Sequence, residues 1–247
     1  MVADVRQGRF AERLEALRAT KLRHTREKQE LIGAMNHDDW ALILPPPESR
    51  EVVQTISGSG MPITDVLIKG FEPQLNHPSG GFFGARACGR NFRALLEAHP
   101  PYVDPMSSLL GGYCVNFSSY RKVGWNPDFD FSHLAPEHAR YRLGHGIGAV
   151  QHFCQDLAIG LELGFGGLLA KIERCRAAQG GRHADFYDAL EDVVRGIQAW
   201  IRTNVAEARW LAAREEDPDL RRNLLEMADI NDRLATEPPR TFREACQ

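Results

Sequence analysis

Apolar residues recur at helical spacing in the second half of the chain, from about residue 134 onward. Over residues 186–211 they return every three or four positions, which is the period of one face of an α-helix. Residues 218–234 repeat this pattern behind Asp217 and Pro218, a pair that suits the N-cap and the first helical position. The sequence therefore predicts two amphipathic helices in this part of the chain.

The first half of the chain has a weaker pattern. Residues 7–32 carry apolar residues among many charges and predict one amphipathic helix or two, in which the basic stretch from Arg18 to Lys28 forms a solvated face. Residues 50–133 are dense in glycine and proline, which predicts loops and short elements. Within them, only residues 90–99 have a clear helical pattern.

Glycines interrupt the apolar pattern of residues 156–178. A glycine costs about 1 kcal/mol relative to alanine in a helix interior. Several of them in one predicted helix therefore indicate close packing against another backbone, or a break near Gly166. They are Gly160, Gly164, Gly166 and Gly167.

The end of the chain predicts one more, very short helix. Thr241 and Glu244 have the spacing of a capping box, in which each side chain accepts a hydrogen bond from the backbone N–H of the other. Pro238 and Pro239 lie just before it and disfavour helix there. Since an isolated helix needs ~12–15 residues, this one must depend on contacts with other segments.

Composition narrows the class of protein. The chain has 247 residues, 43% hydrophobic and 26% charged, with a formal net charge of -3, as in an ordinary globular protein. There is no sustained basic patch that predicts nucleic-acid binding, no apolar stretch that predicts a secretory signal, and no apolar run of ~18 residues that predicts a membrane span. An odd number of cysteines without a CxxC pair favours a reducing compartment, so we expect a cytoplasmic protein without a disulfide framework.

Histidines spaced seven positions apart raise the question of a metal site. They are His138, His145 and His152. Seven residues of a helix rise about 10.5 Å, which is too far for one ion with ligand bonds of ~2 Å. We therefore predict no metal site.

His152 and Asp156 are the best candidates for chemistry that spacing alone offers. On a helix, residues four apart are in contact, and a carboxylate beside an imidazole can orient it or line a polar pocket with it. A plain structural hydrogen bond between the two side chains explains the same spacing. Cys154 would point away from His152 on a helix, so we expect a small buried hydrophobe there rather than a nucleophile.

The segment HFCQDLAIGLELGFGGLLAKI, residues 152–172, resembles a segment of the glycyl radical enzymes, the pyruvate formate-lyase family with its dehydratase branch. His152, Asp156, Gly164 and Gly167 stand at the intervals of the family pattern. The helical stretch that follows is also similar and ends in TFREACQ, close to the family's T-F-x-E-A-x-Q signature. The departures are at positions where the family usually has Gly, Pro and an aromatic residue; here they are Gln151, Gln155 and Leu157.

The resemblance implies a mainly α fold, the N-terminal helical layer of the glycyl radical enzyme α/β barrel, with a loop-rich middle segment and few short strands. Residues 1–247 would form an incomplete pyruvate formate-lyase-like domain, made of N-terminal helices (1–49), a loop-rich segment (50–133) and a helical segment (134–247). The catalytic barrel core would be absent from these residues, and so would the family's cysteine and glycine loops. We therefore assign no catalytic residue to this chain and no bound cofactor, and expect the glycyl radical on another part of the enzyme, installed by a separate activating enzyme.

The implied function is that of the N-terminal part of a radical lyase or dehydratase that cleaves a C–C, C–O or C–N bond of a small polar substrate. His152 and Asp156 would bind the substrate, and the chain alone would be inactive. Its partner would be a second copy or a complementing catalytic chain, and its apolar helix faces would be partly exposed without one. The departures around His152 and Asp156 do not choose between a pyruvate-type acyltransferase and a dehydratase-type lyase, and the His-x-x-x-Asp pattern slightly favours the dehydratase branch. The alternative is a standalone, non-catalytic helical accessory or binding protein derived from the family.

Overall fold

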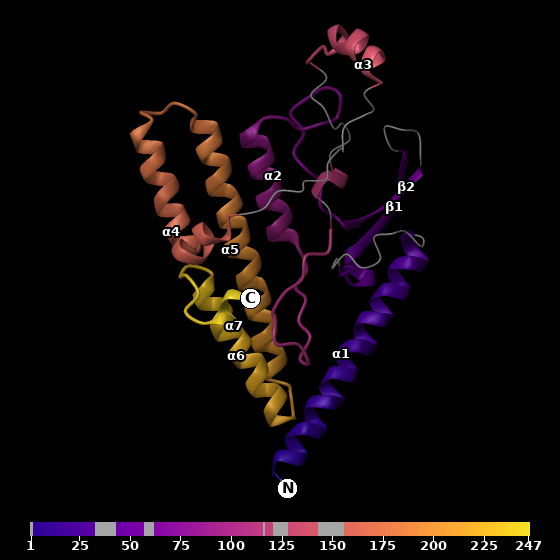
Figure 1. Ribbon diagram of the computed structural model, residues 1–247, viewed down its shortest axis with the longest axis vertical. Coiled ribbons are helices and arrows are strands. Elements are labelled where there is room, and N and C mark those ends of the chain that lie inside the picture. Colours follow the sequence, from indigo (N-terminus) through magenta and orange to yellow (C-terminus); the bar gives the residue numbers. More distant parts are fainter. Residues whose placement is uncertain (1, 33–42, 57–61, 116, 121–127, 143–155) are drawn as a thin grey trace.

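The described part of the protein is mainly helical and contains an antiparallel pair of strands (Figure 1). A computed structural model describes residues 2–32, 43–56, 62–115, 117–120, 128–142 and 156–247. The α-helices are α1 (Val2–Ile32), α2 (Ala85–Ala98), α3 (Ala135–Tyr141), α4 (Leu157–Ala178), α5 (Ala184–Ala212), α6 (Pro218–Leu234) and α7 (Phe242–Ala245). The strands are β1 (Arg50–Ile56) and β2 (Pro62–Ile68), and single 3-10 turns are η1 (Pro47–Ser49), η2 (Phe117–Tyr120) and η3 (Ser132–Leu134). The predicted mainly α fold with few short strands is confirmed.

Helix α5 is the centre of the bundle, with α2, α4 and α6 packed around it (Figure 1). Glycines allow α2 and α5 to cross closely. A Cβ atom added at Gly89 of α2 would lie 2.5 Å from the Cα atom of Ala189, and one added at Gly196 of α5 would lie 2.9 Å from the Cα atom of Arg93. Neither position has room for a side chain, so the crossing depends on these two glycines.

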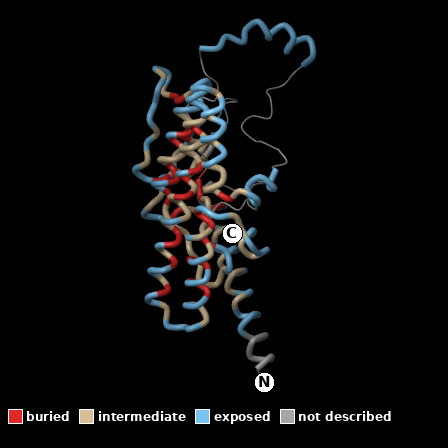
Figure 2. Tube along the Cα trace, turned by 90° about the vertical axis from the view of Figure 1, so that its left-hand side faces the viewer, coloured by how far each residue is buried: buried red, intermediate tan, exposed pale blue. Residues whose placement is uncertain are grey.

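The apolar faces predicted for residues 186–211 and 218–234 form the main core between α5 and α6. Figure 2 shows the buried residues running along the helices of this bundle. Burying an aliphatic side chain fully stabilises the fold by about 1.5–3 kcal/mol. The buried members are Leu110, Val205, Ala208, Ala212, Leu224, Met227 and Ala228.

Helix α6 begins where the sequence predicts. The Asp217 side chain accepts hydrogen bonds from the backbone N–H groups of Asp219 (2.8 Å) and Leu220 (3.2 Å), and Pro218 occupies the first helical position. The cap satisfies N–H groups that have no partner within the helix.

The hairpin of β1 and β2 packs on α2 through a second core. Its strands pair in antiparallel register from Arg50 opposite Ile68 to Ile56 opposite Pro62. The Tyr120 hydroxyl accepts a hydrogen bond from the backbone N–H of Ile68 at 2.7 Å, which ties the strand end to η2. The buried members of this core are Ile68, Leu95, Cys114, Val115 and Tyr120.

Helix α1 differs from its prediction in two respects. Residues 2–32 form a single long helix, but Phe10 and Leu14 are 69% and 53% exposed, so these apolar side chains are largely uncovered in the described chain. Polar contacts hold α1 instead, among them a hydrogen bond from Arg13 to the carbonyl oxygen of Ser107 at 2.8 Å. The predicted solvated face is wrong at Lys28, which is only 4% exposed.

Side-chain amides on the helices hold the loops of the middle segment. Buried Asn91 of α2 accepts a hydrogen bond from the N–H of Gln74 (2.7 Å) and donates one to its carbonyl oxygen (2.9 Å). Asn204 of α5 accepts from the N–H of Tyr102 (2.9 Å), and Asn223 of α6 donates to two loop carbonyl oxygens. Because each amide offers both a donor and an acceptor, it can replace a strand partner for an irregular backbone.

The glycine-rich helix α4 contains a break, as predicted, but at Gly164 rather than near Gly166. Gly164 has φ 60° and ψ 177° inside the helix. The predicted close packing against another backbone is also confirmed. Cβ atoms added at Gly164 and Gly166 would lie 2.5 Å from the carbonyl carbon of Glu237 and 2.6 Å from the carbonyl oxygen of Thr236.

The predicted capping box at the start of α7 is confirmed. The Thr241 hydroxyl oxygen accepts from the N–H of Glu244 (3.3 Å), and the Glu244 carboxylate accepts from the N–H of Thr241 (3.1 Å). Contacts with other segments, which this short helix requires, are made by Gln247, two residues after its last residue. The Gln247 amide oxygen accepts from the N–H of Leu110 (3.0 Å) and from the side chain of Asn231 (2.8 Å).

In the described ranges, no helix is both long and apolar enough to cross a membrane. The cysteines there are free thiols: Cys88, Cys114, Cys175 and Cys246.

Candidate functional site

A cavity of about 480 Å³ lies between α4, α5, the ends of α6 and α7, and the loop 110–112. This volume is in the range of small-molecule sites, which are typically lined by apolar side chains with a few polar groups. The apolar walls come mainly from two helices. They are Leu157, Leu161, Phe165 and Leu168 of α4, and Ile197, Trp200 and Ile201 of α5.

Asp156 lies on the wall of this cavity, at the N-cap of α4. One carboxylate oxygen accepts a hydrogen bond from the backbone N–H of Ala158 at 3.1 Å. The positive end of the helix dipole favours a negative charge at this position. The second oxygen makes no hydrogen bond within the described part of the chain.

The other carboxylates of the lining are already paired. Glu244 forms an ion pair with Arg233 and accepts hydrogen bonds from two backbone N–H groups. The hydrogen bond from Arg233 is the largest cause that lowers the pKa of Glu244. Glu237 is bound by Arg240. Among the carboxylates that line the cavity, Asp156 is therefore the one without a cationic partner in the described chain.

Trp200 is a wall residue that the sequence did not single out. Its ring lies 5.4 Å from that of His99 and 6.3 Å from that of Tyr113, both edge to face. Its indole Nε1 is buried and has no hydrogen-bond partner among the described residues. Ile197 and Ile201 belong to the helical apolar pattern of residues 186–211, and the same spacing places Trp200 beside them. The missing signal was that this face borders a cavity as well as the core.

The structure brings one of the two predicted site residues to the cavity. Asp156 is there, whereas His152 and Cys154 lie outside the described residues. Helix α4 begins at Leu157, so Asp156 precedes it and the helical contact assumed for the pair does not come from α4. The pairing of His152 with Asp156 stays a prediction. Within the described ranges, no cluster of three His, Cys, Asp or Glu side chains is arranged to hold a metal ion.

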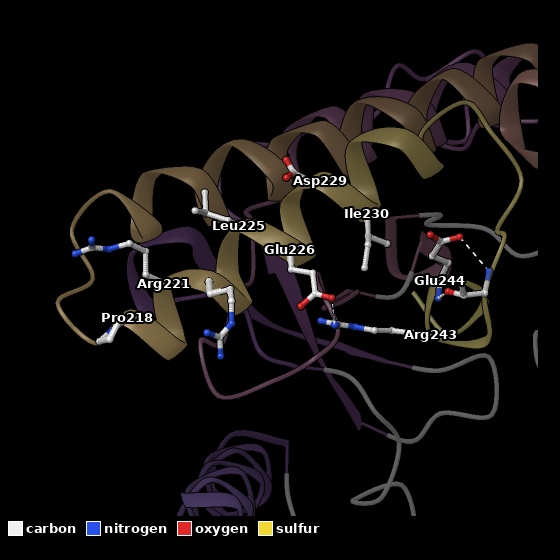
Figure 3. A pocket seen from close by; sticks show the side chains of 10 residues that line it. Pro218, Arg221, Leu225, Glu226, Asp229, Ile230, Arg243 and Glu244 are labelled. Atoms are coloured by element: carbon white, nitrogen blue, oxygen red, sulfur yellow. Dashed lines mark hydrogen bonds and ion pairs between the residues drawn. The ribbon is translucent and has the colours of Figure 1, made fainter. Parts of the chain in front are cut away.

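A more open groove of about 800 Å³ runs along α6 and α7, shown in Figure 3. Its charged side chains are engaged with nearby protein groups. Arg221 donates to the carbonyl oxygen of Glu215 at 2.9 Å, and Arg243 pairs with Glu226. The cavity beside Asp156 has apolar walls and a carboxylate without a cationic partner among the described residues, so we treat it as the candidate site.

Comparison with known proteins identifies the helices that build this cavity. Residues 142–247 match the model of the family described as Pyruvate formate lyase-like. The chain is 27% identical over 117 residues to the 4-hydroxyphenylacetate decarboxylase glycyl radical subunit of Clostridioides difficile, covering 43% of this chain and 12% of that protein. Residues 142–247 are therefore similar to the pyruvate formate lyase-like family and to a glycyl radical subunit.

Three further proteins are similar to this chain in sequence or fold. Isethionate sulfite-lyase of Desulfovibrio desulfuricans is 33% identical over 79 residues, which cover 32% of this chain and 10% of that protein. The glycerol-bound B12-independent glycerol dehydratase from Clostridium butyricum has a TM-score of 0.51 at 16% identity, over 66% of this chain and 28% of that one. A glycyl radical enzyme from Archaeoglobus fulgidus has a TM-score of 0.50 at 19% identity, with the same coverage. The chain thus spans only a small part of the length of these relatives.

The residues that match the family model contain α4, α5, α6 and α7, which supply most of the cavity lining; the loop 110–112 lies outside the matched residues. Three apolar side chains at the start of α4 are exposed beside the cavity. Leu157, Ile159 and Leu161 are 64%, 40% and 44% exposed. This agrees with the expectation of uncovered apolar helix faces.

Proposed function

We propose that the chain forms one wall of the substrate pocket of a glycyl radical lyase or dehydratase that acts on a small polar molecule. The observation that carries the proposal is the position of Asp156. It stands at the interval of the family pattern and lies on the wall of an apolar cavity, and among the described residues one of its carboxylate oxygens has no hydrogen-bond partner. His152 would be the second substrate-binding residue.

The chemistry of the cavity suits such a role. A carboxylate accepts hydrogen bonds from the hydroxyl or ammonium groups of a small substrate and so orients the bond to be broken. Apolar walls exclude water, which strengthens each polar contact and protects reactive intermediates from side reactions. The reaction would be C–C, C–O or C–N cleavage after hydrogen abstraction. The names of the relatives, a decarboxylase, a sulfite-lyase and a glycerol dehydratase, support a lyase of this general kind.

The radical positions would lie outside these residues. The family's cysteine and glycine loops have no counterpart in residues 1–247, so hydrogen abstraction requires another polypeptide segment. This chain would bind no cofactor of its own, and a separate activating enzyme would install the radical on the other segment. A second copy or a complementing catalytic chain would cover the apolar rim.

The first test is spectroscopic. The chain is incubated anaerobically with a glycyl radical activating system and examined by electron paramagnetic resonance. We expect no organic radical on this chain alone, and a signal when a segment that contains both loops is supplied. A radical on residues 1–247 would contradict the proposal that the radical positions lie on another segment. Absence of activity even with both loops present would favour the role of a non-catalytic accessory protein.

The second test concerns Asp156 in the active assembly. Asp156→Asn should lower kcat/KM about tenfold or more, since a hydrogen bond to a charged group contributes on the order of 1.5–3 kcal/mol. Asp229→Asn is the matched control, because Asp229 is an exposed carboxylate of α6 outside the cavity. Equal kinetics for Asp156→Asn and the control would remove Asp156 from the substrate pocket.

A further inference from the structure

The break in α4 is fastened to the turn that follows α6. The backbone N–H of Gly166 donates a hydrogen bond to the carbonyl oxygen of Thr236 at 2.8 Å. Gly164 has φ 60° and ψ 177°, a backbone region that is essentially limited to glycine. We call Gly164, Gly166 and residues 236–238 the glycine clamp.

The two glycines of the clamp are needed for different reasons. At position 164 only glycine fits, both because of the backbone conformation and because there is no space for a side chain. An added Cβ atom would lie 2.5 Å from the carbonyl carbon of Glu237 and 2.5 Å from the nitrogen of Pro238. Gly166 requires only the space beside Thr236. Gly160 lies in the same helix and lines the same cavity, yet an added Cβ atom there would meet nothing within 4 Å.

The turn that receives the glycines is itself fixed to the bundle. Its first residue, Ala235, is fully buried, and its carbonyl oxygen accepts a hydrogen bond from the buried Gln198 side chain of α5 at 2.8 Å. Arg233 of α6 donates to the carbonyl oxygen of Pro238 at 3.1 Å. Because the turn is bonded to α5 and α6, it holds the break in α4 in a defined position relative to these two helices.

The clamp directly follows the part of α4 that has Asp156 as its N-cap and that lines the cavity. Residues 157–163 precede the break, and Asp156 caps their first turn. Gly164 and Glu237 both line the cavity, so the clamp joins two of its walls. We propose that Gly164 and Gly166 are positioning residues, which set the direction of residues 157–163 and thereby place Asp156 at the cavity wall. Its consequence for substrate binding rests on the proposed function.

A distance measurement tests this placement directly. Nitroxide labels are attached at positions 159 and 225 of the full chain, where Ile159 and Leu225 are 40% and 43% exposed, in a background in which every native cysteine except buried Cys114 is replaced by serine. Gly164→Ala and Gly166→Ala are compared with Gly160→Ala by double electron–electron resonance. We expect the distance distribution to shift or broaden in both clamp variants and to stay unchanged in Gly160→Ala.

Hydrogen exchange followed by mass spectrometry separates positioning from general stability. In the clamp variants, exchange of residues 157–163 should become roughly tenfold faster while α5 keeps its protection. Gly166→Ala carries the test if Gly164→Ala does not fold. Unchanged distances in both variants, or loss of α5 protection in both, would overturn the proposal. Neither readout needs catalysis, so a failure of the lyase proposal would appear separately, in the kinetics of Asp156→Asn.

Discussion

His99 is an imidazole held neutral in the core. It is 2% exposed, and its ring stacks on that of Tyr113 at 5.5 Å. Nδ1 donates a hydrogen bond to the carbonyl oxygen of Pro100 at 2.8 Å, which leaves Nε2 to accept from the backbone N–H of Cys114 at 3.1 Å. Both ring nitrogens are thus committed to the neutral form, and burial lowers the pKa of His99 below 6.5.

Stability should therefore fall in acid through His99. Below pH 6.5 the unfolded chain binds a proton at this position that the folded chain does not, so the contribution is full above pH 6.5 and is lost as the pH falls. Urea unfolding at pH 7.5 and at about pH 5.5 should show a larger loss of unfolding free energy for the native chain than for His99→Gln. His24, whose pKa burial also lowers, contributes equally to both proteins. Equal losses would show that His99 does not titrate differently on folding.

Buried side-chain amides form hydrogen bonds with the backbone of the loops. Asn91 and Asn204 satisfy the backbone of Gln74 and Tyr102, segments that have no strand or helix partner. An unsatisfied buried backbone group costs about 1–3 kcal/mol. The loop-rich middle segment is therefore ordered by particular polar residues on the helices around it.

At the scale of elements, α7 shows how a short helix is stabilised by its caps. The capping box of Thr241 and Glu244 closes its start, and Gln247 fastens the following residues to α6 and the loop 108–110. Thr241→Ala should lower the unfolding free energy by about 1 kcal/mol, the typical contribution of an N-cap, and Thr241→Ser should retain most of it. Urea unfolding of the three proteins measures this. An unchanged midpoint in Thr241→Ala would mean that Gln247 and the Arg233–Glu244 pair suffice.

The bundle helices differ in how much of their surface is covered. α5 contacts α2, α4 and α6, and its apolar residues are largely buried. α4 packs mainly on α5 and keeps several apolar residues exposed near the cavity. The difference lies in the number of neighbouring elements, since both helices have apolar residues at suitable spacing.

At the scale of the whole molecule, the cavity has exposed apolar side chains at its edge, among them Leu157 and Leu161. A neutral dye such as Nile red should bind there and fluoresce, and Leu157→Gln combined with Leu161→Gln should reduce the signal. Leu109→Gln is the control, because Leu109 is 49% exposed and lies outside the cavity lining. Equal fluorescence in all variants would show that the dye, and by extension an apolar ligand, does not use this rim.

The sequence by itself determined the elements whose causes are local. Helical periodicity predicted α5 and α6, the Asp217 cap and the capping box at Thr241 marked helix starts, and the family spacing singled out Asp156. These signals involve residues within a few positions of one another, so hydrogen bonds and repeat period suffice to define them.

Only the tertiary structure decided which surfaces those elements bury. It left Phe10 of α1 exposed, buried Lys28, moved the break of α4 to Gly164 and opened a cavity beside Asp156. Each of these depends on segments distant in sequence, such as residues 236–238 against Gly164. Hydrophobic spacing specifies that a helix has an apolar face, but close packing between elements determines whether another backbone, a cavity or solvent meets that face.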